Sequence, residues 1–256
     1  MDLFSVKDKS IAITGASSGF GHHFAGLLAA QGAKVALGAR RTDKIQARVD
    51  EINNSGGTAV GLPLDVNAAA SVDEFLTAAE QAHGPIDVLI NNAGVEAGAK
   101  TFITIDEDDW DRVFDTNLKA PWFMGKRYVE RVIARGSGGG NIINVASISA
   151  YRTIKGQFPY AVSKAGLVRA TEIMALEAAR YEVRVNALAP GYILTDVSRK
   201  LLESERSEAF RKGIPMRRYG EFSDLDGPLM LLASDASRWM TGSVVVVDGG
   251  HICGEM

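Results

Sequence analysis

A chain of 256 residues, 46% hydrophobic and 23% charged, has the composition of a globular protein that can bury a sizeable core. Its 28 basic and 31 acidic residues give a net charge of −3 with both signs interspersed, which argues against nucleic acid or an anionic membrane as a partner. Cys253 is the only cysteine, which excludes an internal disulfide, and we expect a reduced, cytoplasmic protein without a leader or a membrane helix.

Short apolar segments alternate with amphipathic ones along the chain. The apolar segments lie at 10–16, 33–39, 58–66, 86–94, 138–147, 183–191 and 243–250. Helical stretches separate them, including one at 71–83 where Ser71 and Glu74 match a capping box. Strands that alternate with helices and are apolar along their length indicate a parallel sheet covered on both faces. We predict an α/β, Rossmann-type, doubly wound sheet of about seven parallel strands with helices on both faces.

The sequence gives no sign of a second domain. It contains no Pro-rich or Gly/Ser linker and no repeat, so a single domain over 1–256 is expected. The segment 192–220 breaks the alternation because it is long, charged and amphipathic, and its apolar Leu201, Leu202 and Phe210 predict a substrate lid with one buried face. The four histidines lack the spacing of zinc ligands, so no metal site is predicted.

The first predicted strand runs into the sequence TGASSGFG. Gly15, Gly19 and Gly21 fall in the turn that opens the first predicted helix, where backbone amides can meet a pyrophosphate. The spacing is G-x-x-x-G-x-G rather than the usual dinucleotide fingerprint, and a tight strand-to-helix turn would explain the glycines equally well. The position between the first strand and the first helix favours a nucleotide site.

The second predicted strand ends with ALGARRTDK. A fold that prefers NAD carries an acid near this point to bind the adenosine ribose. Ala39 replaces the acid, and Arg40 and Arg41 follow it, so guanidinium groups are available for a 2′-phosphate. These residues favour NADP(H) over NAD(H). A solvated helix start, or an approach of Asp43 to the ribose, remains an alternative interpretation.

Residues 160–164 read YAVSK, which places Tyr160 and Lys164 four positions apart. Side chains at this spacing share one face of a helix. Such a pair also occurs by chance on many solvated helices, so alone it does not indicate chemistry. A nearby ammonium favours the phenolate form of tyrosine, which would suit acid/base catalysis at neutral pH.

With these segments in place, the chain resembles the short-chain dehydrogenase/reductase family over nearly its whole length. The matching motifs are TGASSGFG, DV at 65–66, NNAG at 91–94, Asn117 in FDTNLKAPWF, INVASISA, YAVSK, NALAPGYILT and MTGSVVVVDGG. So many ordered matches are far more specific than any single motif. The resemblance implies an NAD(P)-dependent oxidoreductase.

The resemblance also implies roles for four residues. Tyr160 looks like the general acid/base, and Lys164 looks like the group that lowers its pKa and binds the nicotinamide ribose. Ser147 resembles the hydroxyl that hydrogen-bonds the substrate oxygen, and Asn117 the residue that positions a water linking Lys164 to solvent. Without the resemblance, Ser147 would indicate a strand-end turn and Asn117 would be a poor helix former inside a helix.

A cofactor site made of several separate segments follows from the same resemblance. Asp65 is expected at the adenine edge and Thr195 at the nicotinamide amide. The expected cofactor residues are Gly15, Ser17, Gly19, Phe20, Gly21, Arg40, Arg41, Asp65, Val66, Asn92, Ala93, Gly94, Tyr160, Lys164, Pro190, Gly191, Ile193 and Thr195. The expected substrate residues are Ser147, Ser149, Gln157, Tyr160 and Tyr192.

The predicted pocket wall is largely apolar and also includes Val95, Glu96 and Phe158. We therefore expect interconversion of a small or medium hydrophobic ketone and its secondary alcohol. Glu96 could instead hydrogen-bond a polyol, which keeps an NAD-dependent sugar or polyol dehydrogenase open as an alternative.

Two more functions remain alternatives. A 3-oxoacyl-(acyl-carrier-protein) reductase shares the motif set and needs a basic surface for its acidic carrier. The available basic residues are Lys126, Arg127, Arg131 and Arg169, whereas Leu176 and Glu177 stand where such reductases tend to carry a basic residue. A nucleotide-binding regulator without turnover would be favoured by loss of the catalytic residues, which are all present.

Two apolar segments near the end of the chain, PLMLLASDAS and SVVVVDGG, look like the surfaces on which this family builds two-fold interfaces. Core packing within one subunit would explain much of the same apolarity. The sequence predicts a homotetramer.

Overall fold

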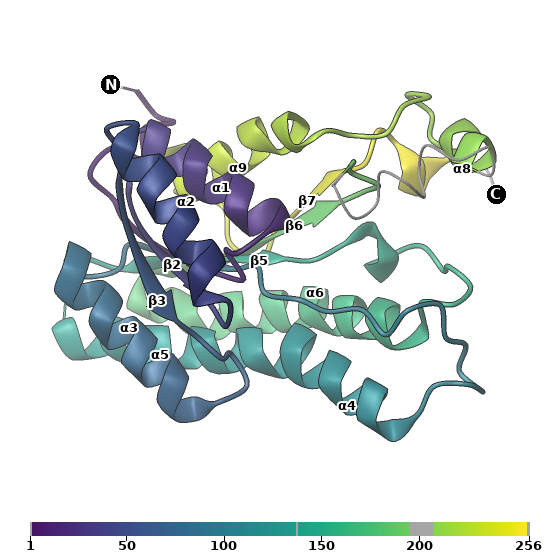
Figure 1. Cartoon of the computed structure of the whole chain (residues 1–256), viewed down its shortest axis with the longest axis horizontal. Helices are drawn as coiled ribbons and strands as arrows, with labels where there is room; N and C mark the ends of the chain where they lie inside the picture. The colour runs from purple at the N-terminus through teal and green to yellow at the C-terminus, as the bar shows by residue number, and fades with distance from the viewer. Residues whose placement is uncertain (1, 137, 195–206, 255–256) are drawn as a thin grey trace.

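The computed structural model describes residues 2–136, 138–194 and 207–254. Seven parallel strands form one sheet in the order β3-β2-β1-β4-β5-β6-β7 (Figure 1). The strands are β1 (Ser10–Thr14), β2 (Lys34–Ala39), β3 (Thr58–Pro63), β4 (Val88–Asn91), β5 (Gly140–Val145), β6 (Val183–Pro190) and β7 (Val244–Val247). The predicted doubly wound sheet is confirmed.

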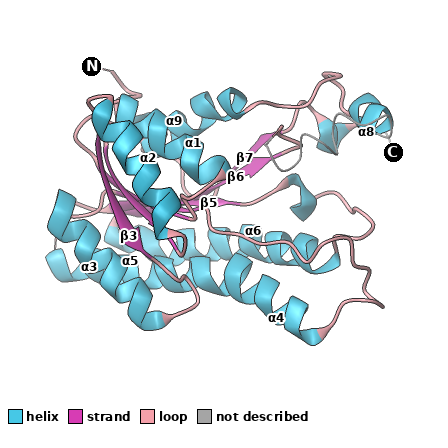
Figure 2. Ribbon diagram, viewed as in Figure 1, coloured by secondary structure: helices cyan, strands magenta, loops and turns pink. Residues whose placement is uncertain are grey.

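Helices cover both faces of the sheet, and α1, α2 and α9 lie on the face opposite to α3, α5 and α6 (Figure 2). The helices are α1 (Gly19–Ala30), α2 (Thr42–Asn54), α3 (Ala69–His83), α4 (Glu107–Phe114), α5 (Ala120–Arg135), α6 (Phe158–Ala178), α8 (Ser207–Gly213) and α9 (Asp226–Ala233). A π-helical segment, Asp115–Lys119, joins α4 to α5. One-turn 3₁₀ helices lie at Ile148–Ala150, Ala179–Tyr181, Phe222–Leu225, Asp235–Ser237 and His251–Cys253.

Alternate side chains of the central strands enter two main cores on opposite faces of the sheet. Ile11 and Ile13 of β1 pack with α1, α2 and α9, whereas Ala12 between them packs with α3, α5 and α6. Both sets are fully buried, which is why the strands read as continuous apolar runs. The sheet is thereby held rigid, and the segments that follow the strand ends are available for function.

The predicted capping box at the start of α3 is wrong. The helix begins two residues earlier, at Ala69, and its N-cap residue is Ala68, whose side chain offers no cap. The Ser71 hydroxyl instead accepts a hydrogen bond from the amide of Asp65 at 2.9 Å. Ser71 therefore stabilises the turn after β3, a contact that a local sequence motif cannot distinguish from a cap.

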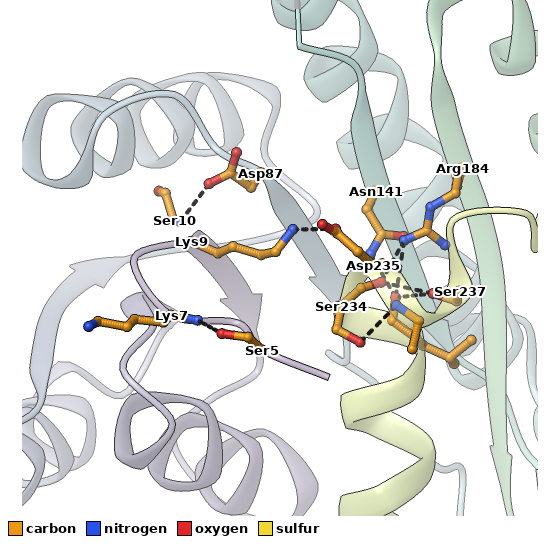
Figure 3. Close-up of polar contacts among 12 residues, drawn as sticks. Ser5, Lys7, Lys9, Ser10, Asp87, Asn141, Arg184, Ser234, Asp235 and Ser237 are labelled. Carbon is orange, nitrogen blue, oxygen red and sulfur yellow. Dashed lines mark hydrogen bonds and ion pairs between the residues drawn. The ribbon is translucent and has the colours of Figure 1, made fainter. Parts of the chain in front are cut away.

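The amino-terminal edge of the sheet is closed by polar contacts (Figure 3). Lys9 Nζ pairs with Asp235 at 2.9 Å, and the side-chain Nδ2 of Asn141, on β5, donates to the Leu232 carbonyl at 2.8 Å. Arg184 of β6 donates to the carbonyls of Leu232 and Ser234 at 3.3 and 3.5 Å. These donors satisfy the last carbonyls of α9 and fix that helix to the sheet.

The predicted lid at 192–220 is described only in part. Leu201 and Leu202 lie outside the described residues. Phe210, on α8, is half exposed, and its ring centroid is 6.0 Å from that of Tyr192. The closing of a lid over the site therefore stays a prediction.

Candidate active site

A cavity of about 380 Å³ opens at the carboxyl ends of the central strands. The chain leaves β1 toward β2 and β3 and then crosses back to β4, so the connections after β1 and β4 diverge and leave a crevice. The lining residues are Gly15, Ser17, Ser18, Phe20, Ala39, Arg40, Arg41, Leu64, Asp65, Val66, Asn67, Asn92, Ala93, Gly94, Val95 and Thr116. Ten of the predicted cofactor residues are thus gathered around one space.

The glycine loop is shaped for close approach of a ligand to the backbone. Gly15 has a φ of 67°, and a Cβ there would lie 2.7 Å from Ala93 Cα. A Cβ at Gly21 would collide with the Asn92 side chain. Ser18, the N-cap of α1, provides no side-chain cap, so the first amides of the helix are left for another acceptor. This arrangement fits the pyrophosphate of a dinucleotide.

Two arginines lie where the adenosine end of a dinucleotide would reach. Arg41 Nη2 donates to Ser17 Oγ and Ser18 Oγ, both at 2.8 Å, which holds the guanidinium against the glycine loop. Arg40 also lines the cavity, beside the small side chain of Ala39. Asp43, the alternative ribose ligand, is not among the lining residues. The donor set fits a 2′-phosphate.

Thr14 is a site residue that the sequence analysis missed. Its hydroxyl accepts hydrogen bonds from the amides of Asn92 and Ala93, both at 3.0 Å. Asn92 Nδ2 in turn donates to the Thr14 and Gly15 carbonyls at 2.9 and 3.2 Å. These bonds lock the glycine loop to the end of β4. The available signal was a hydroxyl residue at the last position of a strand.

Tyr160 and Lys164 lie on one face of α6, as predicted, with Lys164 Nζ 5.7 Å from the centroid of the Tyr160 ring. The ammonium is buried and donates to the Val145 carbonyl at the end of β5, at 2.7 Å. Ser147 follows two residues after that carbonyl and is 9% exposed. The end of β5 thus brings the Val145 carbonyl, which binds Lys164, close to Ser147.

Asn117 lies in the π-helical segment between α4 and α5 and is fully buried. Its Oδ1 accepts from the Val95 amide at 2.8 Å, and its Nδ2 donates to the Val95 carbonyl at 2.9 Å and to Ser163 Oγ at 3.2 Å. A Cβ at Gly94 would lie 3.4 Å from Asn117 Oδ1 and 3.8 Å from Lys164 Nζ. The widened helical turn therefore brings the Asn117 side-chain amide close to Lys164, and π-helical turns often lie at functional sites.

Burial dominates the electrostatics of the pair. It raises the pKa of Tyr160 to about 12, an effect that the nearby Ser147 hydroxyl opposes, and it lowers the pKa of Lys164 to about 8. The negative charge of Glu96 raises both pKa values. The expected lowering of the Tyr160 pKa by Lys164 stays a prediction, because the ammonium donates to the Val145 carbonyl here and burial is the largest effect on the phenol.

A family model described as enoyl-(acyl carrier protein) reductase matches residues 15–251. The chain is 34% identical to human dehydrogenase/reductase SDR family member 4 over 244 residues, 95% of this chain and 87% of that one. It is 36% identical to the 3-oxoacyl-(acyl-carrier-protein) reductase of Thermotoga maritima over 96% of this chain and 99% of that one. The chain belongs to the short-chain dehydrogenase/reductase family. It is an NAD(P)-dependent oxidoreductase.

Solved structures of this family agree with the fold. A gluconate 5-dehydrogenase from Burkholderia cenocepacia, in complex with NADP and tartrate, superimposes with a TM-score of 0.93 at 30% identity, and the match covers 99% of each chain.

Within residues 2–136, 138–194 and 207–254, no helix is long and apolar enough to cross a membrane, and no three potential metal ligands gather.

Several predicted cofactor residues lie outside the cavity. Gly19 opens α1 with a φ of 59°, and Gly191 packs so closely on Asp248 that a Cβ would lie 2.7 Å from its Cα. Pro190 ends β6, and Ile193 pairs with Gly220 in an isolated bridge. Thr195 lies outside the described residues. The described members Pro190, Gly191 and Ile193 thus lie together at and after the carboxyl end of β6.

Proposed function

We propose that the protein is an NADP(H)-preferring reductase that converts a small or medium, largely hydrophobic ketone to its secondary alcohol and can run the reverse reaction. The observation that carries this proposal is the face of α6 shared by the Tyr160 phenol and the buried Lys164 ammonium, which is bound to the Val145 carbonyl two residues before Ser147. A phenol is protonated at neutral pH and can donate that proton to a carbonyl oxygen.

Four side chains have separate roles in the proposed reduction. Tyr160 delivers the proton, and Ser147 donates a hydrogen bond to the same substrate oxygen and stabilises the negative charge that develops on it. Lys164, held by the Val145 carbonyl, supplies positive charge beneath the phenol. Asn117 fixes the backbone of Val95 and contacts Ser163 on α6, so it keeps the wall of the site in register with the catalytic helix.

The cofactor, when bound, supplies the hydride. Its pyrophosphate would be held by the glycine loop and the first amides of α1, its 2′-phosphate by Arg41 with Arg40, and its nicotinamide ribose by Tyr160 and Lys164. The contacts of Arg41 with Ser17 and Ser18 support NADP(H) over NAD(H), since they orient a guanidinium before any phosphate arrives.

The aromatic residues around the substrate side support a hydrophobic ketone. Phe158, at the start of α6, lies 6.2 Å from Phe102 and 5.6 Å from Trp110 between ring centroids. Phe102 is 69% exposed, so its ring is available to an apolar substrate. A panel of aliphatic and aryl ketones, cyclic diketones, sugar lactones and 3-oxoacyl thioesters, each with NADPH and NADH, tests the proposal. Turnover confined to polar substrates would contradict it.

The acyl-carrier alternative is less well supported because the basic residues it would use are already paired. Arg127 binds Asp73 and Glu130, and Arg131 binds Glu80. Lys126 and Arg169 face Glu130 and Glu172 in the same way. An acidic carrier would have to displace these carboxylates. Turnover of carrier-bound thioesters alone would favour the alternative.

A polyol dehydrogenase is a second candidate because of Glu96. Its carboxylate acts on Tyr160, Lys164 and Tyr192, so a negative charge lies within reach of the reacting atoms. A carboxylate accepts hydrogen bonds from sugar hydroxyls. NAD-dependent oxidation of sugars or polyols by the wild type, lost in Glu96→Ala, would favour this function.

We further propose a homotetramer. β7 is the edge strand of the sheet, and its four valines are only partly buried. Trp122, Ile173 and Leu176 leave apolar surface exposed on α5 and α6 as well. Light scattering gives the answer directly, since a mass near the 27.4 kDa of one chain would refute association.

A further inference from the structure

A chain of hydrogen bonds leads from the Ser147 hydroxyl to Gln157. The Ser149 amide donates to Ser147 Oγ at 3.1 Å, and Ser147 Oγ donates to Ser149 Oγ at 3.3 Å. Ser149 Oγ then donates to Gln157 Oε1 at 3.0 Å. Ser147 and Ser149 are both buried. Hydroxyl groups withdrawn from water in this way are oriented by their partners rather than by solvent.

The carbonyl oxygen of Gln157 sets the direction of this chain because it can only accept. Ser149 donates its hydroxyl proton to Gln157 Oε1, so Ser149 Oγ can only accept a hydrogen bond from Ser147. Ser147 Oγ therefore keeps its own proton as a donor. Its 3.3 Å contact with Ser149 is long for an O–H···O bond, for which about 2.7–2.8 Å is usual, so the proton can turn to a substrate oxygen at little cost.

Gln157 is also placed unfavourably for its own helix. It is the N-cap of α6, yet its side chain makes no cap hydrogen bond. Serine, threonine, aspartate and asparagine are preferred at this position because their short side chains accept from the first amides. The longer glutamine side chain reaches Ser149 instead, and its backbone pairs with Lys100 in an isolated bridge. A residue that breaks a local preference in this way is expected at a functional site.

We propose that Gln157 is a positioning residue of the reaction. By engaging Ser149, it holds the Ser147 hydroxyl as a donor toward the substrate oxygen. This inference rests on the role that the proposed function gives to Ser147. It departs from the sequence-based expectation that Ser149 and Gln157 touch the substrate, because the Ser149 hydroxyl and the Gln157 carbonyl are engaged with each other.

The first test compares kinetic constants on two ketones of different shape that the wild type reduces. Gln157→Met keeps the side-chain length and removes the acceptor, and Ser149→Ala removes the link itself. Each lowers kcat about fivefold, as expected for one neutral hydrogen bond, and leaves KM and the Kd for NADPH unchanged on both ketones. Gln157→Glu, which restores an acceptor oxygen, recovers most of the rate. Gln81→Met, the same change at an exposed position of α3, has no effect.

The second test places Gln157→Met in a Ser147→Ala background. Because Gln157 acts only through Ser147, the second substitution causes no further loss of kcat there. Equal losses in both backgrounds would overturn the proposal, and so would a KM increase that differs between the two ketones, which marks direct substrate contact. If Gln157→Met does not fold, Ser149→Ala carries the same comparison.

The failure of the underlying function is distinguishable from the failure of this inference. A Ser147→Ala variant with wild-type turnover refutes the assignment of Ser147 and, with it, the role of Gln157. If Ser147→Ala lowers kcat but Gln157→Met does not, only the positioning role of Gln157 is refuted.

Discussion

The adenosine side and the substrate side of the site are built from different parts of the fold. Strand ends and the first turn of α1 form the adenosine side, where Thr14, Asn92 and Gly15 bind one another through backbone and side chain. The substrate side is formed by the connections after β4, β5 and β6, where partly or largely exposed aromatic rings meet at centroid distances of 5.6 to 6.2 Å. Single substitutions should therefore have sharper effects on cofactor binding and chemistry than on substrate choice.

The largest effect is expected at the acid itself. Tyr160→Phe removes a proton donor and little volume, so kcat should fall about 10³-fold, within the range of lost acid/base catalysis. The Kd for NADPH should rise only slightly, since Lys164 still holds the nicotinamide ribose and the main interaction removed is made in the transition state. Single-turnover kinetics with fluorescence titration of NADPH measure both quantities. Near wild-type turnover would place the acid elsewhere.

Lys164→Met should abolish turnover and yet stabilise the cofactor-free protein at pH 7 by on the order of 1–2 kcal/mol, because it removes a buried charge at the loss of one hydrogen bond. Burial lowers the pKa of Lys164 to about 8, below its unfolded value, so unfolding takes up a proton between these two values. The cost of the buried ammonium is therefore full at neutral pH and fades as the pH rises through 8 toward 10. Urea denaturation across that range measures the difference, and a pH-independent gap would contradict it.

Arg41→Ala should raise the Kd for NADPH about tenfold and leave that for NADH unchanged, the loss expected for a charge-assisted contact. Arg40→Ala is the matched control and should raise the Kd for NADPH less. Arg41 is held by hydrogen bonds to Ser17 and Ser18, and no such bond to the glycine loop is seen for Arg40 among the described residues. Equal increases in the Kd values for NADPH and NADH would show that Arg41 does not bind the 2′-phosphate.

The smallest effect is expected on the substrate side. Phe102→Ala should raise KM for an aryl ketone about threefold and leave kcat and NADPH binding unchanged, since an exposed ring loses little burial when it is removed. Trp239→Ala, at an aromatic residue that is 97% exposed near the amino-terminal edge of the sheet, is the control. A hundredfold change in KM would mean that single substitutions affect the substrate side as strongly as the adenosine side.

The sequence predicted the strands, the glycine turn and the helix that carries Tyr160 and Lys164 because each depends on local chemistry. Apolar runs reveal buried strands, and Tyr160 and Lys164 need only helical spacing to share a face. The anchoring of Lys164 on the Val145 carbonyl and of Asn92 on Thr14 could not be predicted, because these contacts join segments 19 and 78 residues apart. Ser71 was misread for the same reason, since its partner Asp65 lies outside the motif that suggested a cap.

The π-helical segment at Asp115–Lys119 has a consequence for insertion and deletion. A π-helical turn holds one residue more than an α-helical turn, so losing one residue there would close the wide turn and leave the facing of α5 unchanged. Met124 and Tyr128 of α5, now fully buried, would stay in the core, whereas Asn117 would leave Val95. A one-residue deletion is thus expected to disturb the site without displacing the helix that follows it.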